Sequence, residues 1–241
     1  MYMMDLNMRK FQEQKKHINT VLLPIGMVEA HGPHCSLGTD VLIPREFIKR
    51  LNVALDEKIM IAAEIPYGRS FALRPFDGTI DISSETFINY VYEVGQEFYR
   101  NGFQNLILFN GHGGNIPSLQ IASEKLAELG MVVLTMNWWL DYRNTIVTIT
   151  PGFGHAGEDE TSLILAINEE LAETQGLVPN ELPAYFNVKY KNWGNDLFPD
   201  AYSGNPGEST AAKGEQLYEA IIPLMINDIE NLWSISNEQG E

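Results

Sequence analysis

The sequence predicts an α/β protein in which a mostly parallel sheet lies between two layers of helices, a three-layer α/β/α fold. Short apolar runs such as TVLLPIG (20–26) and NLILFNG (105–111) have the length and composition of buried strands. Longer amphipathic stretches lie between them, for example SSETFINYVYEVGQEFYRNG (83–102). Strands that alternate with helices in this way are typical of a parallel sheet covered on both faces.

The predicted elements follow one another in a regular order. After the first strand, residues 43–58 are predicted as a helix with Pro44 near its start, and IMIAAEIP (59–66) as a second strand. The helix over 83–102 has a serine at its cap and Gly102 as its stop signal. A strand at 105–111, a helix at 117–129 and a strand at 131–136 come next, and helices over 161–173 and 210–233 complete the chain.

The 241 residues are predicted to form a single domain, 1–241, since no repeat or linker interrupts the pattern. Residues 179–207 are rich in Pro, Asn, Gly and aromatic residues, which predicts a long loop over one face. Long loops of this kind often carry function.

Composition limits the partners and the compartment. The net charge of −16 disfavours nucleic acid and anionic membranes. The single cysteine, Cys35, excludes an internal disulfide and is expected to be a packed thiol in a reducing compartment. Since no signal peptide or membrane-length apolar run is visible, we expect a cytoplasmic protein.

Two loops with metal-binding side chains follow two of the predicted strands. LPIGMVEAHGPHCSLGTD (23–40) contains Glu29, His31 and Asp40, and NGHGGN (110–115) contains His112. Because ligands bind beyond the carboxyl ends of parallel strands, these loops are expected to meet at one edge of the sheet. The glycines of NGHGGN do not form a phosphate-binding P-loop, because no Lys-Ser/Thr pair follows them.

A third loop, GFGHAGEDETS (152–162), supplies His155, Glu158 and Glu160 ahead of a predicted helix. Imidazoles and carboxylates without thiolates suit Zn²⁺, Mn²⁺ or Fe²⁺. Since a carboxylate can bridge two ions, the sequence allows more than one metal.

These three motifs, with PFDGT (75–79) and GNPGESTAAKGE (204–215), resemble the creatininase family in content and order. The resemblance implies a site for two divalent metal ions, Zn, Mn or Fe, and a homo-oligomer, often a hexamer. Carried over by motif, Glu29 and His112 would hold one metal, His31 the other, and Asp40 would bridge them. His155 matches the catalytic histidine of the family.

The sequence departs from creatininase proper at two places. Creatininase has a metal-binding glutamate two residues after the histidine of NGH, and here that position is Gly114. Glu158 is the candidate to replace it as a ligand, or else it supports a ligand without touching the metal. Glu160 is the second choice as a ligand and is expected instead to orient His155 or to stabilise the helix start. Creatininase also has a tryptophan shortly before its catalytic histidine, whereas Phe153 is the only aromatic residue there. Creatinine itself is therefore not the expected substrate.

The function predicted from these residues is that of a metal-dependent amidohydrolase that cleaves a C–N bond in a small, cyclic or open, amide substrate. Two cations would bring the pKa of a shared water toward about 7, and the resulting hydroxide would attack the carbonyl carbon. His155 would then move a proton to the leaving nitrogen.

Three alternatives remain open at this stage. The first is a hydrolase of a cyclic keto-sugar of the inosose type, acting on a C–C or C–O bond. The second is a non-catalytic, metal-stabilised family member. The third is a phosphoribosyl-type formamide hydrolase, which would need a cationic pocket built from Arg69, Arg74 and Lys213.

Other residues near the motifs have simpler expected roles. His34 is expected beside the metal ligands without being one, and His17 on the surface. Trp138 and Trp139 are neighbours, so at most one faces the core and the other is available as a wall of the substrate pocket.

Overall fold

The computed structural model describes residues 1–183 and 188–239. Its sheet contains β1 (Thr20–Ile25), β2 (Met60–Ile61), β3 (Asn105–Asn110) and β4 (Val132–Asn137) in the order β2-β1-β3-β4. All three strand pairs are parallel, and the register aligns Thr20 with Asn105 and Asn105 with Val132. The central strands therefore end at the same level.

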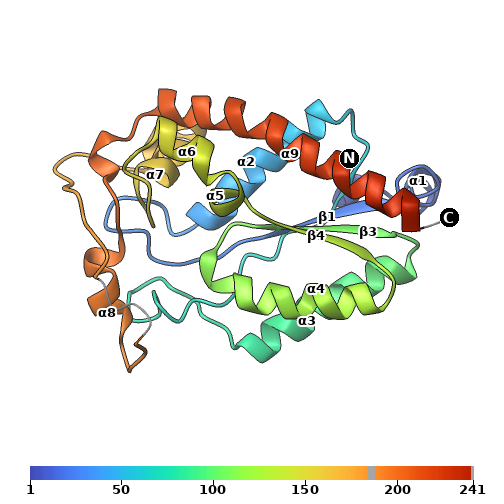
Figure 1. Ribbon diagram of the computed structural model, residues 1–241, viewed down its shortest axis with the longest axis horizontal. Helices are drawn as coiled ribbons and strands as arrows, with labels where there is room; N and C mark the ends of the chain where they lie inside the picture. Colours follow the sequence, from blue (N-terminus) through green and yellow to red (C-terminus); the bar gives the residue numbers. More distant parts are fainter. Residues whose placement is uncertain (184–187, 240–241) are drawn as a thin grey trace.

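Helices cover both faces of this sheet, which confirms the predicted three-layer fold (Figure 1). One face carries α3 (Ser84–Arg100) and α4 (Ile116–Glu128). The other carries α2 (Thr39–Ala54), α7 (Glu158–Ile167) and the long α9 (Ala211–Gln239). α9 ends beside α1 (Met8–Gln14), at the end of the sheet opposite α8 (Gly194–Leu197).

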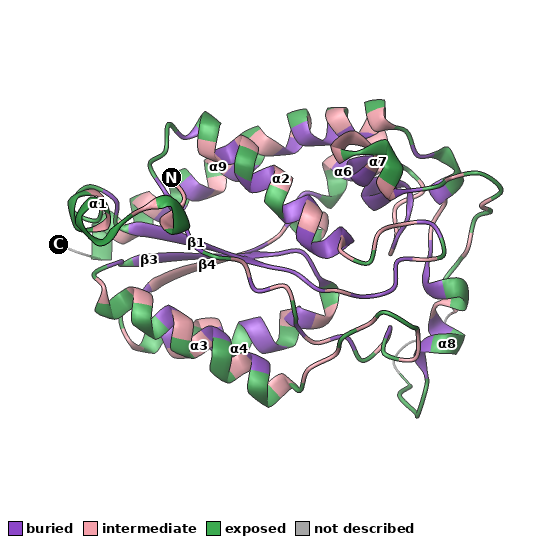
Figure 2. Ribbon diagram, turned by 180° about the vertical axis from the view of Figure 1, so that it is seen from behind, coloured by how far each residue is buried: buried purple, intermediate pink, exposed green. Residues whose placement is uncertain are grey.

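Successive strand residues face opposite layers, as the two-residue period of a strand requires. Leu23 and Leu106 pack in the core shared with α3 and α4, whereas Leu22, Ile107 and Phe109 pack against α2 and α9. Every residue of β1 and β3 is buried (Figure 2). This burial explains why both strands are apolar runs rather than alternating sequences.

Four predicted elements have clearly different boundaries in the structure. The helix predicted over 43–58 runs from Thr39 to Ala54, and the helix predicted over 210–233 runs from Ala211 to Gln239. The second strand was predicted over 59–66 but is limited to Met60–Ile61. Beyond it, the chain still donates backbone hydrogen bonds to β1 from Ala62 and Ile65, so it follows β1 without regular pairing. The helix predicted over 161–173 begins at Glu158 and ends at Ile167, because Asn168 leaves the helix and caps a separate turn.

The segments between these elements contain short helices that the sequence pattern did not indicate. They include α5 (Trp138–Asp141) and α6 (Arg143–Ile149), which follow β4 directly. The predicted long loop at 179–207 contains α8 and two 3₁₀ turns, the second of them at its end, and its residues 184–187 lie outside the described part. Within the described residues, the 3₁₀ turns are Met3–Asp5, Gly113–Asn115, Glu169–Leu171, Pro199–Ala201 and Pro206–Glu208. Among the described helices, none has the length and apolar character needed to cross a membrane.

Candidate metal and catalytic site

Two glycines at the strand ends bring the start of α2 between the first two loops. Gly26 follows β1 and Gly111 follows β3. A Cβ atom would lie 2.5 Å from the backbone oxygen of Asp40 at Gly26, and 2.1 Å from the same oxygen at Gly111. Only glycine allows the backbone of Asp40 to approach both strand ends this closely. Asp40 therefore lies where the two loops meet.

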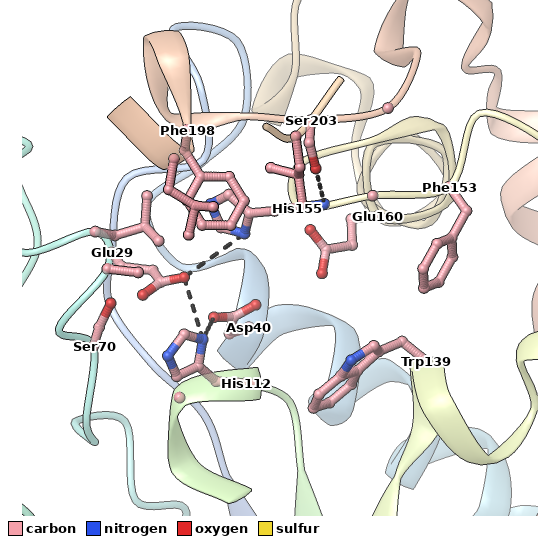
Figure 3. Close-up of a pocket in the computed structure, with 18 of the residues that line it drawn as sticks. Glu29, Asp40, Ser70, His112, Trp139, Phe153, His155, Glu160, Phe198 and Ser203 are labelled. Carbon is pink, nitrogen blue, oxygen red and sulfur yellow. Dashed lines mark hydrogen bonds and ion pairs between the residues drawn. The ribbon is translucent and has the colours of Figure 1, made fainter. Parts of the chain in front are cut away.

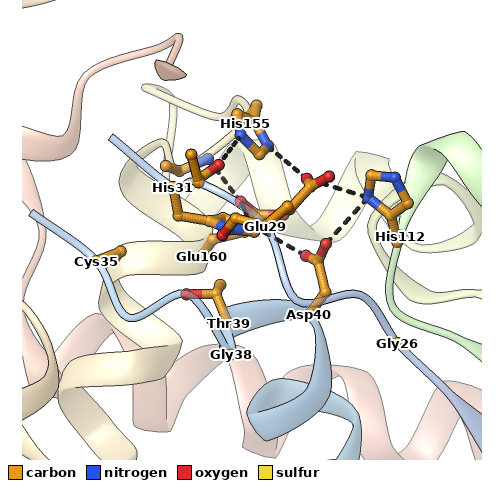
Figure 4. A network of polar contacts seen from close by, with 12 residues as sticks. Gly26, Glu29, His31, Cys35, Gly38, Thr39, Asp40, His112, His155 and Glu160 are labelled. Atoms are coloured by element: carbon orange, nitrogen blue, oxygen red, sulfur yellow. Dashed lines mark hydrogen bonds and ion pairs between the residues drawn. The ribbon is translucent and has the colours of Figure 1, made fainter. Parts of the chain in front are cut away.

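The first group of donor atoms comes from Glu29, Asp40 and His112, all buried (Figure 4). Nδ1 of His112 lies 3.2 Å from Oε1 of Glu29 and 3.0 Å from Oδ2 of Asp40. One ligand atom from each residue lies within 4.8 Å of the others. This spacing fits a single cation between an imidazole and two carboxylates.

The second group shares Asp40 with the first and adds His31 and Glu160. Nε2 of His31 lies 3.1 Å from Oδ1 of Asp40 and 3.7 Å from Oε2 of Glu160. The two oxygens of Asp40 thus face different histidines, Oδ1 toward His31 and Oδ2 toward His112. A carboxylate in this position is suited to bridge two cations.

Each of the three site histidines is oriented by a backbone carbonyl. In each ring, one nitrogen lies within hydrogen-bond distance of a carbonyl oxygen, and the other faces the carboxylates. The pairs are His31 Nδ1 with Glu29 at 3.1 Å, His112 Nε2 with Arg69 at 3.1 Å, and His155 Nε2 with Ala30 at 3.0 Å. When the first nitrogen donates its proton to the carbonyl, the second is free to bind a metal or a proton.

The electrostatics of the cluster also fit cations. Neither carboxylate oxygen of the fully buried Glu29 accepts a hydrogen bond within the described part of the chain. Burial alone would lower the pKa of His31, but Asp40, Glu160 and Glu29 outweigh it and raise that pKa to about 10. The pKa of His112 is raised for the same reason, by Glu29 and Asp40 against the effect of burial. The acids therefore attract positive charge strongly, which is the condition for a divalent metal site.

His155 lies beside this cluster. Its Nδ1 is 3.8 Å from Oε1 of Glu29, and its ring centroid is 4.4 Å from that of His31. Burial and the positive charge of His31 lower the pKa of His155 to about 4. His155 is therefore neutral at pH 7, with Nδ1 available to accept a proton. Glu29, His31 and His155 also form a third group of possible metal donors.

The loop that carries His155 is held by three consecutive acids at the start of α7. The backbone N–H groups of the loop donate to them in turn: Gly152 to Glu158 at 2.6 Å, Gly154 to Asp159 at 3.1 Å, and Ala156 to Glu160 at 2.6 Å. Ala156 has a φ of 47°, a conformation that is strained for alanine. Its carbonyl accepts a hydrogen bond from the Thr161 hydroxyl, so both sides of this residue are fixed.

The two glutamates at the start of α7 have different surroundings in the structure. Glu158 is buried, but its carboxylate contacts Lys213 Nζ at 2.5 Å and the Gly152 N–H, and it belongs to none of the donor groups found in the described residues. Glu160 instead joins His31 and Asp40. The carboxylate of Glu160 therefore accepts a hydrogen bond from the Ala156 N–H and also faces the metal-binding cluster.

The position of Gly114 has no room for a side chain. A Cβ atom there would lie 2.1 Å from the carbonyl oxygen of Arg69 and 2.5 Å from Nε2 of His112. The same carbonyl accepts the hydrogen bond that orients His112. A side chain at position 114 would therefore collide with the Arg69 carbonyl that orients His112, which explains why this position has no carboxylate.

The cluster lies at the base of a cavity of about 670 Å³ (Figure 3). Trp139 lines this cavity whereas Trp138 is buried in the core, in agreement with the expectation that the neighbours point apart. Ser70, Phe153 and Phe198 also line it, and Figure 3 shows Ser70 and Phe153 on opposite sides of the acids. The Ser70 hydroxyl is buried and has no hydrogen-bond partner within the described residues.

Other residues singled out in the sequence lie outside the cluster. His34 contacts the carbonyl of Ala156 at 3.0 Å and thereby supports the His155 loop. Burial raises the pKa of the Cys35 thiol to about 12, so it is not a thiolate at neutral pH. His17 is exposed. Arg69 pairs with Asp81.

The cationic phosphate pocket considered from the sequence does not form around the cavity. Arg69, Arg74 and Lys213 are not among the described residues that line it. Lys213 is paired with Glu158, and Arg74 is exposed. Sequence patterns did not single out several cavity-lining residues, among them Ser70, Arg143, Asn180 and Phe198, because none belongs to a motif or a predicted element face.

Comparison with known proteins gives consistent matches. The model of a family described as Creatininase, creatinine amidohydrolase, matches residues 4–229. A 3-dehydro-scyllo-inosose hydrolase from Thermotoga maritima is 27% identical over 86% of this chain and 69% of its own. A mycofactocin precursor peptide peptidase from Mycolicibacterium smegmatis is 27% identical over 84% of this chain and 81% of its own.

Solved structures share the fold. A mutant creatininase described as Zn-Zn type is 23% identical, covers 95% of this chain and 97% of its own, and has a TM-score of 0.80. A structure described as Creatininase Mn has the same identity and coverage, with a TM-score of 0.81.

Proposed function

Because the chain belongs to the creatininase family, we propose that it is a metal-dependent amidohydrolase that uses two divalent cations to cleave the C–N bond of an amide. The observation that carries this proposal is the pair of donor groups that share Asp40 at the base of the cavity. Zn²⁺ and Mn²⁺ suit these nitrogen and oxygen donors, and solved creatininases are described with both metals.

We assign one cation to Glu29, Asp40 and His112, and the other to His31, Asp40 and Glu160. This assignment uses Glu160 in place of Glu158, because only Glu160 faces His31. When bound, the two cations supply a nucleophile from water at neutral pH and polarise the substrate carbonyl.

His155 is the proposed proton carrier. Its Nε2–H donates to the carbonyl of Ala30, so Nδ1 faces the cluster as the free base. Because Nδ1 of this ring is unprotonated and faces the cluster, the ring can take a proton from the attacking water and return it to the leaving nitrogen. Glu160 has a second role, since its bond to the Ala156 N–H holds the loop that positions this ring.

The substrate is expected to enter through the cavity above the cluster. Its volume of about 670 Å³ falls in the range of roughly 300–1,000 Å³ that holds drug-sized ligands. The buried, unpartnered Ser70 hydroxyl on one side is available to hydrogen-bond a bound substrate. Assembly into a homo-oligomer, a hexamer by resemblance, stays a prediction.

The test is a substrate panel on the metal-loaded protein, with release of free amine as the readout. We expect amine release from acyclic or cyclic amides, and its loss in His155→Gln with the metal content unchanged. Ring opening of a keto-sugar without amine release would favour the inosose-type alternative, which is the activity named for the Thermotoga relative. Full metal loading without turnover of either class would contradict the enzyme assignment and favour a non-catalytic member.

A further inference from the structure

One wall of the cavity includes a positively charged side chain, that of Arg143. Trp139 and Leu140 in α5, Arg143 at the start of α6, and Phe153 in the catalytic loop all line this side. The guanidinium carbon of Arg143 lies 5.3 Å from the centroid of the Phe153 ring. Phe153 is two residues before His155, so the guanidinium is stacked on the loop that carries the proposed proton carrier.

The guanidinium of Arg143 has no acidic partner. Within the described part of the chain, Arg143 is the only lysine or arginine that lines the cavity, and no ion pair or hydrogen bond involves it. Three cations that belong to the sequence motifs or pack near them do have acidic partners: Arg69 pairs with Asp81, Lys213 with Glu158, and Arg50 with Glu215. Arg143 is exposed and, although the chain has 32 acids, none of them pairs with it in the described part, so its guanidinium is open to a ligand that enters the cavity.

Stacking on Phe153 leaves the N–H groups of Arg143 free at the edge of the guanidinium. A planar guanidinium can donate two parallel hydrogen bonds to a carboxylate, and stacking on an aromatic ring holds its plane in place. N-acylated amino acids form a common class of molecules that carry a carboxylate close to an amide bond.

We infer that Arg143 binds a carboxylate of the substrate, and that the substrate is an N-acylated amino acid or short peptide with a free carboxylate. This inference rests on the proposed function and specifies its substrate class. In the reaction, a water oxygen bonds to the acyl carbon, the C–N bond breaks, and the protons of water are shared between the released acid and amine. The acyl group lies against the apolar residues of the cavity, including Phe71, Leu73 and Phe198.

One feature of the cavity points to a competing class. Glu181, an exposed acid, also lines the cavity and would suit an ammonium group. The test therefore compares three compounds with the same acyl group: N-acyl-leucine, the neutral N-acyl-leucinol, and an N-acyl diamine with a free ammonium group.

For the metal-loaded full-length protein, kcat/KM from amine release should be about 10–100-fold higher for N-acyl-leucine than for N-acyl-leucinol, as one charge-assisted bidentate contact allows. Arg143→Gln should remove this preference by raising KM for the carboxylate alone, and Arg143→Lys should keep part of it. Arg9→Gln, in the distant α1, is the matched control and should change nothing.

Equal rates for the acid and the alcohol, a preference for the ammonium compound, or an equal effect of Arg143→Gln on all three would overturn the inference. Failure of the Arg143 inference can be distinguished from failure of the proposed function by calorimetry. In that experiment, the binding of N-acyl-leucine and N-acyl-leucinol to metal-loaded His155→Gln is measured without turnover. A carboxylate preference in binding that Arg143→Gln abolishes upholds the anion subsite even without turnover. Turnover without that preference rejects the subsite and leaves the amidohydrolase in place.

Discussion

Metal binding to this site should release protons, and their number follows from the two ligand histidines. The acids around them raise the pKa of His31 to about 10 and the pKa of His112 well above its usual value. Below those pKa values both rings carry an extra proton, and a cation that binds Nε2 of His31 or Nδ1 of His112 must displace it. Affinity for metal is therefore lost as the pH falls and gained as it rises.

The expected size of the effect is one proton for each histidine. Each displaced proton changes an association constant about tenfold per pH unit, so the product of the two constants should rise about 100-fold per unit between pH 6 and 8. This corresponds to roughly 2.7 kcal/mol per pH unit. Burial raises the pKa of Glu160, so its carboxyl adds to the proton count wherever it is protonated before binding.

The assay is calorimetric titration of the metal-free protein with Zn²⁺ or Mn²⁺ in buffers of equal pH and different ionisation enthalpy. At pH 7 the dependence of the heat on the buffer should give at least about two protons released per chain. His31→Gln and His112→Gln should each lower this number by about one. Tight binding of two ions with no proton released would show that these histidines are not protonated in the metal-free protein or do not bind the metals, and would refute the reasoning.

Three further predictions concern the residues around the cluster. Glu160→Gln should lower the affinity for one of the two ions by about 10–100-fold or more, whereas Glu158→Gln should retain both in elemental analysis, and an equal loss in the two variants would contradict the assignment. His155→Gln should keep the metal and lower kcat by about 10²–10⁴-fold, while loss of an ion would make His155 a ligand. Lys213→Met should lower the free energy of unfolding by about 1–3 kcal/mol in denaturant titrations, because it leaves the buried Glu158 carboxylate without its cation. Adding Glu158→Gln to this variant should restore part of the lost free energy. An unchanged unfolding midpoint in Lys213→Met would show that the ion pair is not needed for stability.

The layered fold could be predicted because its signals are local. The strands around Leu22 and Ile107 are apolar on both faces, and the helix from Ser84 carries its own cap and stop residues. The meeting of the first two loops could be predicted as well, since parallel strands of equal register end at one edge. The short β2 could not, because regular pairing there depends on its neighbour and not on its own sequence.

The choice between Glu158 and Glu160 depends on geometry that spacing alone does not define. Two residues apart on a helix, they point in directions about 200° apart, so only one can face the cluster. Which one does is determined by the turn at Ala156, with its φ of 47°, and by Lys213, which comes from α9 and pairs with Glu158. Neither the turn nor this distant partner can be read from the loop sequence.

The walls of the cavity were also beyond the sequence pattern. Arg143 lies in a short helix without amphipathic periodicity, and Phe198 and Ser203 lie in the irregular part of the 179–207 region. Such residues reach the site only through tertiary packing of segments that have no strong local preference. Their contribution to specificity therefore becomes visible only with the fold.

Anomalous diffraction from crystals grown with Mn²⁺ or Zn²⁺ would locate the two proposed cations. We expect two peaks at the base of the cavity, one among Glu29, Asp40 and His112, the other among His31, Asp40 and Glu160, with Asp40 contacting both. A single peak that Asp40 does not contact, or no peak in the cavity from protein that hydrolyses amides, would contradict the proposed two-cation site.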